Sequence, residues 1–145
     1  DDFAMLHPGG TLGRKLLLHV EDFMHKGDEV PLIREDTLIK EGLLEMTSKR
    51  LGVTGVCDTK GAFVGVITDG DLRRALEKEG NVLNQQASTI MTRNPKTIAK
   101  DDLAAKALHR MEEFAITSLI ILSDDDSRKP IGIIHMHDLL KVGVV

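Results

Sequence analysis

The sequence predicts an α/β (α+β) fold made of two copies of one β-α-β-β-α unit, related by pseudo-twofold symmetry. The first observation is a repeat, in which Gly65 to Leu72 (GVITDGDL) is matched by Gly132 to Leu139 (GIIHMHDL). The separation is constant, because 132 minus 65 and 138 minus 71 both give 67, and Met91 matches Met24 at the same distance. The second observation is that apolar residues lead into a polar turn in both segments, as where a strand precedes a helix. A tandem repeat of this length indicates the architecture of the whole chain.

The first copy contains five predicted elements. Val30 to Ile33 is a short extended segment, and Glu35 to Thr37 offers capping groups for a helix with an apolar stripe at helical spacing. We expect Gly52 to end that helix. The strands Val53 to Asp58 and Phe63 to Thr68 follow, joined by a turn of hairpin composition. A second helix completes the unit ahead of the glycine at position 80.

The second copy repeats this order with different surface chemistry. A short strand at Thr97 and Ile98 precedes a helix with its own apolar stripe. The strand Ser118 to Leu122 is almost entirely apolar, as expected for a strand covered on both faces. A charged hairpin loop leads to the strand Ile131 to His135, and the last helix runs from about Met136.

The repeat also sets the expected domain boundaries. Residues 20–82 form the first predicted domain and residues 83–145 the second, with the polar segment Asn81 to Gln86 between the copies. Residues 1–19 belong to neither copy. The chain begins in mid-pattern at Asp1 without an initiator Met, so we expect residues 1–19 to be the tail of a preceding domain.

Composition and charge exclude several classes of function. The chain has 145 residues of which 41% are hydrophobic, enough for one core or for two small cores that share an interface. The net charge is -4, no Lys/Arg run exceeds two residues, and Trp and Tyr are absent, so we expect no nucleic-acid partner. No apolar stretch approaches the roughly 18 residues that span a bilayer, and no signal segment is present. We therefore expect no membrane partner and a cytoplasmic location. The single cysteine, Cys57, lies in an apolar run, so we expect it to be a buried core thiol.

The candidate site lies where the second long strand of each copy ends. Thr68 and Asp71 stand there in the first copy, and His135 and Asp138 hold the matching positions in the second. A Thr hydroxyl and backbone N–H groups at a helix N-terminus suit an anionic group such as phosphate. A carboxylate one turn further on accepts two hydrogen bonds, which matches the paired hydroxyls of a ribose. These residues predict nucleotide sites in clefts between the copies.

A purely structural interpretation competes with this one. Asp69 and Asp71 would then only cap a helix, each for less than about 1 kcal/mol. The recurrence of Asp138 at the matching position favours the ligand. Weaker candidates for lining the same clefts stand at the strand starts: Val53, Thr54, Gly55, Thr117 and Ser118. Here we align Ile116, Thr117 and Ser118 with Val53, Thr54 and Gly55.

A metal site is the alternative interpretation of His135, His137 and Asp138, because alternate strand residues share a face and His is a common ligand. Their counterparts, Thr68, Gly70 and Asp71, supply no comparable ligand set, so we expect no metal. The serines lack a nucleophile elbow, and the glycines form neither a phosphate loop nor a dinucleotide fingerprint. The chain offers little sign of self-sufficient catalysis.

With both strand-end motifs in hand, residues 20–145 resemble a tandem pair of cystathionine β-synthase (CBS) domains, a regulatory nucleotide-binding module. The pattern of that family ends each copy with Gly, two apolar residues, Thr or Ser, two variable residues and Asp, which Gly65 to Asp71 meets. The resemblance implies that Asp71 and Asp138 hold ribose hydroxyls. The second copy departs from the pattern, because His135 replaces the Thr or Ser expected to contact phosphate.

The whole chain is also similar to the C-terminal part of bacterial D-arabinose 5-phosphate isomerases. Three stretches carry this resemblance: His7 to Leu17 (HPGGTLGRKLL), Thr68 to Arg74 (TDGDLRR), and His135 to Leu140 (HMHDLL) with its Gly143-Val144-Val145 ending. The resemblance implies a separate N-terminal domain that interconverts D-arabinose 5-phosphate and D-ribulose 5-phosphate, feeding the Kdo branch of lipopolysaccharide or capsule synthesis. It places His7 in the active site of that full-length parent, and this chain by itself is expected to be non-catalytic.

We therefore expect a regulatory pair that requires no cofactor and binds a nucleotide or sugar nucleotide. AMP and ATP are the ligands that the wider family implies. CMP-Kdo is a further hypothesis, because feedback on an early step needs a sensor for a downstream product. The alternative is an assembly module whose clefts stay empty. We also expect a homodimer through the CBS pairs and a tetramer in the full-length parent.

Overall fold

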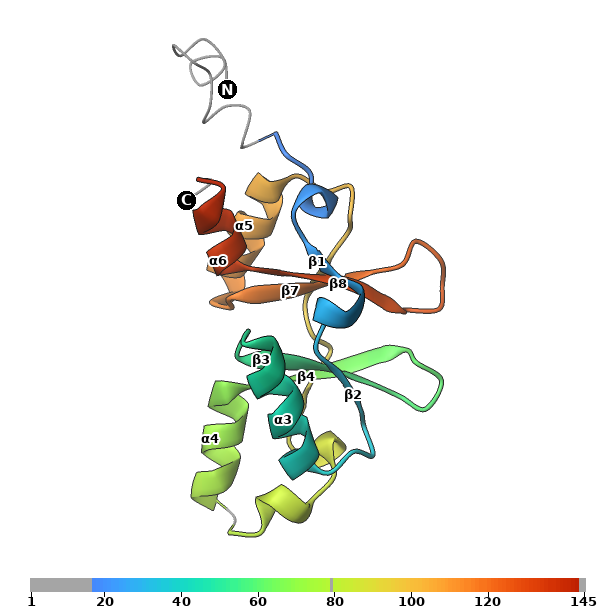
Figure 1. The fold of residues 1–145 in the computed structure, drawn as a ribbon, viewed down its shortest axis with the longest axis vertical. Helices are drawn as coiled ribbons and strands as arrows, with labels where there is room; N and C mark the ends of the chain where they lie inside the picture. The colour runs from blue at the N-terminus through green and yellow to red at the C-terminus, as the bar shows by residue number, and fades with distance from the viewer. Residues whose placement is uncertain (1–16, 79, 144–145) are drawn as a thin grey trace.

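A computed structural model of the protein describes residues 17–78 and 80–143 (Figure 1). The molecule has two halves stacked along its long axis, and each half contains a four-stranded sheet with helices beside it. His7 and most of the predicted tail at residues 1–19 lie outside the described residues.

The first half contains the sheet β2-β3-β4-β5. Its strands are β2 (Leu32–Arg34), β3 (Val53–Cys57), β4 (Phe63–Thr68) and β5 (Thr92–Arg93), and its helices are α3 (Ile39–Lys49) and α4 (Asp69–Lys78). Strands β2 and β3 are parallel, whereas β3 pairs with β4 and β4 with β5 in antiparallel fashion.

The second half contains the sheet β1-β8-β7-β6. Its strands are β1 (His25–Lys26), β6 (Thr97–Ile98), β7 (Ser118–Leu122) and β8 (Pro130–His135), and its helices are α5 (Ala104–Phe114) and α6 (Met136–Lys141). Four short 3-10 turns occur between these elements: η1 (Val20–Asp22), η2 (Gly27–Glu29), η3 (Val82–Asn84) and η4 (Ala87–Thr89). The predicted α/β fold with two similar halves is confirmed.

Each sheet takes one edge strand from the segment that precedes the other copy. Strand β1 pairs with β8, with His25 opposite Ile133. Strand β5 pairs with β4, with Thr92 opposite Val66. The sequence did not predict these two-residue strands, since they carry no apolar alternation and their partners lie in the other copy.

Three apolar cores stabilise this arrangement. Two lie within the halves, between sheet and helices, and contain Val56 in the first half and Ile121 in the second. The third joins the two sheets, which face one another at the middle of the molecule (Figure 1), and contains Phe63, Ile120 and Ile133. Because neighbouring residues of β7 belong to different cores, the apolar run that the sequence shows there is explained.

The two hairpins are also joined at their ends. The Phe63 backbone N–H donates to the Arg128 carbonyl oxygen over 2.9 Å, and the Arg128 Nε donates back to the Phe63 carbonyl oxygen over 3.2 Å. These bonds fix the relative position of the sheets on the side away from the helices.

The local signals around α3 were partly misread. The helix begins after Leu38 without a side-chain cap, and the Thr37 hydroxyl accepts the Arg34 N–H across a turn instead. The helix ends at Lys49, where Arg50 takes the left-handed conformation with φ 62°, and Gly52 follows with φ 70°. Gly52 therefore shapes the turn into β3 and does not itself end the helix.

The alignment of the strand starts also needs correction. Val53 pairs with Thr68, and Ser118 pairs with His135. Val53 is thus the counterpart of Ser118, and the earlier alignment, which placed Gly55 there, was wrong by two residues. A gap in the helix and turn before the strand cannot be located from sequence alone, because both copies are apolar in this stretch.

Candidate functional site

The end of β4 and the end of β8 form the same local structure. The Asp71 carboxylate accepts the Thr68 backbone N–H over 3.0 Å, and the Thr68 hydroxyl accepts the Asp71 N–H over 3.1 Å. In the other half, Asp138 accepts the His135 backbone N–H over 2.7 Å, and the His135 Nδ1 accepts the N–H of His137 over 3.0 Å. Each aspartate therefore stabilises the first turn of the helix that follows its strand.

A cleft of about 540 Å³ opens beside Asp71 between the two halves. Its volume lies within the range of small-molecule sites. Apolar and polar side chains share its walls: Val53, Val66, Thr68, Gly70, Asp71, Arg74, Thr92, Asn94, Pro95, Lys96, Phe114, Ala115, Ile116, Thr117, Ser118 and Ile120. Residues from both copies thus meet in one concave site, which we call the Asp71 cleft.

The structure brings five of the predicted site residues together here. These are Val53, Thr68, Asp71, Thr117 and Ser118. Thr54 is fully buried and donates its hydroxyl proton to the Gly55 carbonyl oxygen. A side chain at Gly55 would collide with Leu32, so this glycine belongs to the sheet packing. His135 and Asp138 lie at the end of β8 in the other half.

The polar groups of the Asp71 cleft are already paired with one another. The Asp71 carboxylate accepts from the Thr68 hydroxyl at 3.1 Å, from Arg74 Nη2 at 2.7 Å and from the Thr92 hydroxyl at 3.1 Å. Arg74 belongs to the same helix, and its side chain is 65% exposed. The Asp71 side chain is only 10% exposed, but the Arg74 end of the pair lies in solvent, so the guanidinium can move away into water when a ligand binds.

The helix N-terminus is a weaker anion site than the sequence suggested. Asp69 and Asp71 both lie in the first turn of α4 and offset the positive end of its dipole. The Thr68 hydroxyl also donates its hydrogen bond to Asp71, so it is not free to donate to a phosphate. Positive charge comes instead from Arg74 and from Lys96, whose Nζ lies 4.3 Å from the centroid of the Phe114 ring.

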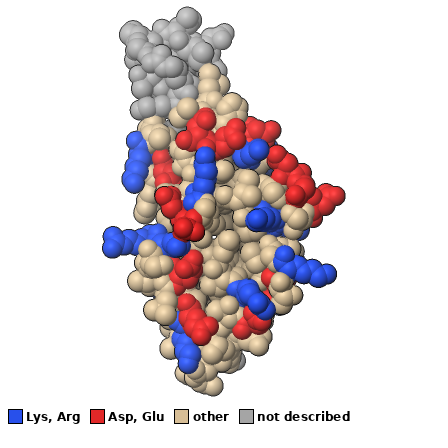
Figure 2. All heavy atoms as spheres, turned by 45° about the vertical axis from the view of Figure 1, so that its right-hand side comes forward, with Lys and Arg blue, Asp and Glu red and all other residues tan. Residues whose placement is uncertain are grey.

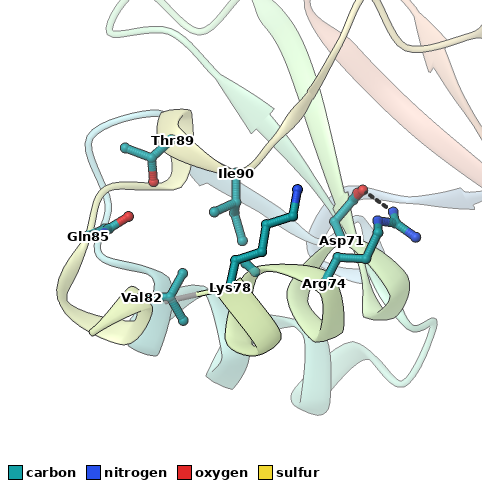
Figure 3. A pocket seen from close by; sticks show the side chains of 8 residues that line it. Asp71, Arg74, Lys78, Val82, Gln85, Thr89 and Ile90 are labelled. Atoms are coloured by element: carbon teal, nitrogen blue, oxygen red, sulfur yellow. Dashed lines mark hydrogen bonds and ion pairs between the residues drawn. The ribbon is translucent and has the colours of Figure 1, made fainter. Parts of the chain in front are cut away.

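A side groove adjoins the Asp71 cleft (Figure 3). It has a volume of about 430 Å³ and shares Asp71 and Arg74 with the cleft. Its remaining wall consists of Ala75, Lys78, Val82, Gln85, Thr89 and Ile90. Figure 3 shows the Lys78 side chain extending along this groove on the same side as Asp71. A ligand held at Asp71 thus has two cationic side chains beside it, Arg74 and Lys78.

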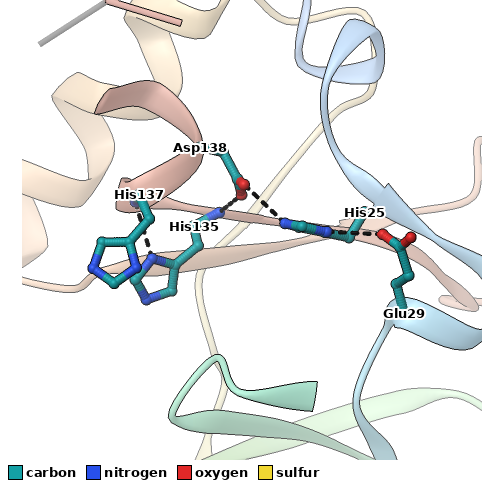
Figure 4. Close-up of polar contacts among 5 residues, drawn as sticks. All are labelled: His25, Glu29, His135, His137 and Asp138. Carbon is teal, nitrogen blue, oxygen red and sulfur yellow. Dashed lines mark hydrogen bonds and ion pairs between the residues drawn. The ribbon is translucent and has the colours of Figure 1, made fainter. Parts of the chain in front are cut away.

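The Asp138 end is covered by a histidine from the N-terminal segment (Figure 4). His25 Nε2 lies 2.8 Å from one Asp138 carboxylate oxygen, and His25 Nδ1 lies 2.8 Å from a Glu29 carboxylate oxygen. Carboxylates only accept hydrogen bonds, so both ring nitrogens must carry a proton to make both bonds. The geometry therefore favours a charged imidazolium between two acids.

The two histidines beside Asp138 have opposite pKa shifts. Burial lowers the pKa of His25, but its hydrogen bonds to Glu29 and Asp138 outweigh burial, and the pKa is raised from 6.5. Burial lowers the pKa of His135, and the nearby His137 lowers it further against the attraction of Asp138. The surroundings thus favour the neutral form of His135 and the charged form of His25.

The contact of His25 corrects its expected exposure. The charged neighbours of this histidine along the chain are typical of a solvated side chain, yet its side chain is only 29% exposed. The repeat contained the missing signal. His25 and Thr92 are separated by 67 residues, and each bonds the aspartate of its half. Glu29 and Lys96 have the same separation: Glu29 bonds His25, and Lys96 lines the Asp71 cleft.

The described residues offer neither a metal site nor a membrane span. Within residues 17–78 and 80–143, no group of three His, Cys, Asp or Glu side chains is arranged to hold a metal ion. In the same part of the chain, every helix is too short or too polar to serve as a membrane span. Figure 2 shows Lys and Arg interspersed with Asp and Glu over the face it presents, without an extended field of one sign.

The family was decided by comparison with known proteins. The CBS domain model matches residues 20–78 and 87–144, one match in each half of the structure. The chain belongs to the CBS domain family. The predicted resemblance to a CBS pair is confirmed.

The relatives with curated descriptions are longer proteins. The chain is 46% identical over its whole length to arabinose 5-phosphate isomerase KdsD of Pseudomonas aeruginosa and spans 44% of that relative. It is 43% identical to arabinose 5-phosphate isomerase KdsD of Escherichia coli and spans 43% of it. The chain thus covers less than half the length of these relatives.

Solved structures with the same fold include two CBS proteins with bound ligands. The CBS domain pair of protein MJ0100, in complex with 5′-methylthioadenosine and S-adenosyl-L-methionine, has a TM-score of 0.76 at 23% identity and covers 87% of this chain and 95% of its own. CBSX2 in complex with AMP has a TM-score of 0.72 at 20% identity and covers 87% of this chain and 96% of its own. At these identities the likeness establishes the fold of the CBS pair.

Proposed function

We propose that this CBS pair is a regulatory module that binds one nucleotide or sugar nucleotide in the Asp71 cleft. The observation that carries the proposal is the cleft itself, where residues of both copies surround a carboxylate whose arginine partner a ligand can displace. A ligand that bridges the halves changes how firmly they are held together, and regulation needs such a coupling.

The lining of the cleft fits the parts of a nucleotide. Val53, Ile116 and Ile120 offer apolar contact for a flat base between the two sheets. Asp71 accepts the paired hydroxyls of a ribose once Arg74 has moved aside. Thr117 and Ser118, at the start of β7, offer polar atoms to the edge of the base.

The side groove favours a ligand with an additional anionic part. Arg74 and Lys78 lie along this groove, and Lys96 lies in the cleft next to it. A phosphate chain or a sugar acid attached to the nucleotide would meet a cationic side chain both in the side groove and in the cleft. ATP and the cytidine sugar nucleotide CMP-Kdo meet this requirement, whereas AMP offers a single phosphate. The AMP complex of CBSX2 supports the nucleotide class.

The full-length parent is, in this proposal, an arabinose 5-phosphate isomerase. Two relatives at 46% and 43% identity carry that name, and this chain would be their regulatory part. The parent would interconvert D-arabinose 5-phosphate and D-ribulose 5-phosphate in the Kdo branch of lipopolysaccharide or capsule synthesis, in the cytoplasm, with His7 in its active site. The CBS pair would then sense a product of the same pathway.

Exposed apolar side chains favour a second candidate, an assembly module. Leu44 on α3, Leu76 on α4 and Leu140 on α6 are 72%, 47% and 53% exposed. These helices lie on the outer sides of the two sheets (Figure 1). A homodimer through the helices, and a tetramer of the parent, would cover such residues. In this case the clefts need no ligand.

Calorimetric melting with AMP, ATP, CMP and CMP-Kdo in turn separates the two candidates. A ligand at about one hundred times its dissociation constant adds about 2.7 kcal/mol and raises the midpoint by several degrees. One nucleotide that raises the midpoint supports the sensor. A midpoint that no nucleotide moves, in a protein that sediments as a stable dimer, contradicts the sensor and supports the assembly module.

A further inference from the structure

The two halves present the same carboxylate with different covers. Thr92 donates its hydroxyl to Asp71, and at the matching position His25 bonds Asp138. Thr92 of β5 lies opposite Val66 of β4, and His25 of β1 lies opposite Ile133 of β8. The backbone therefore presents both side chains in the same way. The side chain at this one position supplies the contact that each aspartate receives from the neighbouring edge strand.

The imidazole is a much more complete cover than the threonine. A threonine hydroxyl satisfies one lone pair of Asp71 and leaves the cleft open, with Asp71 and Thr92 both in its wall. His25 reaches Asp138 across 113 positions of sequence and is held on its other side by Glu29. Asp71 also has a cationic partner, Arg74, but that side chain is 65% exposed, whereas His25 is 29% exposed and is bonded to a second acid. A positively charged donor that is held on both sides thus occupies the Asp138 carboxylate.

We infer that His25 acts as an internal ligand of Asp138 and keeps the second ribose position, which the CBS resemblance implies there, closed as a latent site. This inference rests on the proposed function of the Asp71 cleft. It assigns one ligand to each chain and names the residue that sets this number.

The cover is sensitive to the charge of His25. The charged groups that face its ring are Glu29 on η2 and Asp138 on α6, and His135 at the end of β8 adds a neutral ring to the same cluster. Loss of the proton from His25 leaves one ring nitrogen without a proton to donate, so one of its two carboxylate bonds is lost. The latent site is therefore closed more firmly at acid pH than at alkaline pH.

A reciprocal exchange of the two covers tests the inference. Titration calorimetry with AMP and with CMP, at about pH 6 and about pH 8, would compare the wild-type protein with His25→Thr and Thr92→His. We expect one equivalent of nucleotide for the wild type, two for His25→Thr, and none or a tenfold weaker first site for Thr92→His. The double variant His25→Thr with Asp138→Ala should return to one equivalent, which identifies Asp138 as the carboxylate of the new site.

The outcomes separate this inference from the proposed function. Two equivalents in the wild type, or one equivalent in both the wild type and His25→Thr, would overturn the latent site and leave the Asp71 cleft intact. A wild type that binds nothing beside a His25→Thr variant that binds one equivalent would support the latent site and contradict the Asp71 cleft. Failure of both proteins to bind either nucleotide would overturn both. Equal melting midpoints of the ligand-free proteins, within a few degrees, would establish that the variants fold.

Discussion

The two strand ends of this CBS pair, Thr68 to Asp71 and His135 to Asp138, share a backbone frame and differ in their surroundings. Beside Asp71 stand a threonine, an exposed arginine and an open cleft. Beside Asp138 stands a half-buried imidazolium between two acids. Duplication has kept the hydrogen bonds that begin each helix, whereas the groups that contact the carboxylate from outside the helix have diverged.

The hydrogen bonds within each helix start are structural, whereas the contacts that each aspartate makes outside its helix are specific to its half. The aspartate in either half accepts the N–H of the residue three positions before it, so its presence alone requires no ligand. The chemistry of the site is set by residues of the segments that precede the copies, at positions 25 and 29 in one half and 92 and 96 in the other.

The largest expected difference is in ligand stabilisation. Asp71→Ala should abolish the gain of about 2.7 kcal/mol that a nucleotide gives at one hundred times its dissociation constant, because the ribose loses its acceptor. Asp138→Ala should keep that gain. Melting of both variants with and without nucleotide measures it, and equal losses would mean that the two ends are not functionally different.

The next comparison tests whether the frames are equivalent. A Cβ at Gly65 would lie 2.7 Å from Met91 Sδ and 3.0 Å from the Thr92 carbonyl oxygen, and at Gly132 it would lie 2.6 Å from Met24 Sδ and 3.1 Å from the His25 carbonyl oxygen. The methionine sulfur can move, but the carbonyl belongs to the paired strand. Gly65→Ala and Gly132→Ala should therefore each lower the free energy of unfolding by about 1–3 kcal/mol. Urea unfolding measures the loss in each variant. If one loss falls within this range and the other outside it, the two halves pack differently.

A smaller effect is the pH dependence of the Asp138 half. The pKa of His25 is raised in the folded protein, so its contribution is fully present below 6.5 and is lost as the pH rises through the folded pKa. The lowered pKa of His135 acts on the other side, since its contribution is present above 6.5 and is lost as the pH falls through the folded pKa. The half should be most stable near the pH where these two limbs meet.

His25→Gln isolates the alkaline limb. We expect this variant to lose the decline in stability above 6.5, while the wild type keeps it. Thermal melts across the pH range give the difference. An unchanged alkaline limb in His25→Gln would contradict the charged state of the imidazole.

The smallest effect belongs to the Arg74 cover. Because the Arg74 side chain is 65% exposed and its pair with Asp71 lies within one helix, Arg74→Ala should change the free energy of unfolding by less than about 1 kcal/mol. A urea titration that found a larger loss would indicate a rigid cover, and Asp71 would then be no easier to reach than Asp138.

The sequence predicted the central elements of this fold and missed its edges. Strands β3, β4, β7 and β8 were located within about one residue, since apolar runs bounded by turns define them. Strands β1 and β5 were missed because a two-residue edge strand has no periodicity of its own. Their pairing with the opposite copy depends on the closed fold.

The candidate site divides in the same way. Thr68 and Asp71 followed from the repeat, and their place in a cleft with Thr117 and Ser118 depends on how the two sheets face each other. The cover at His25 is a contact across 113 residues, which composition and local pattern do not reveal. The match of Met24 with Met91, extended by one residue, would have drawn attention to it. Ligand binding by these residues stays a prediction.

The central claim is that the two ends differ in access, and backbone amide NMR during a nucleotide titration tests it most directly. With AMP or CMP, we expect shift changes at Thr68, Asp71, Thr117 and Ser118, with the amides of His135 and Asp138 unmoved. Equal changes at both ends, or changes confined to His135 and Asp138, would contradict the account.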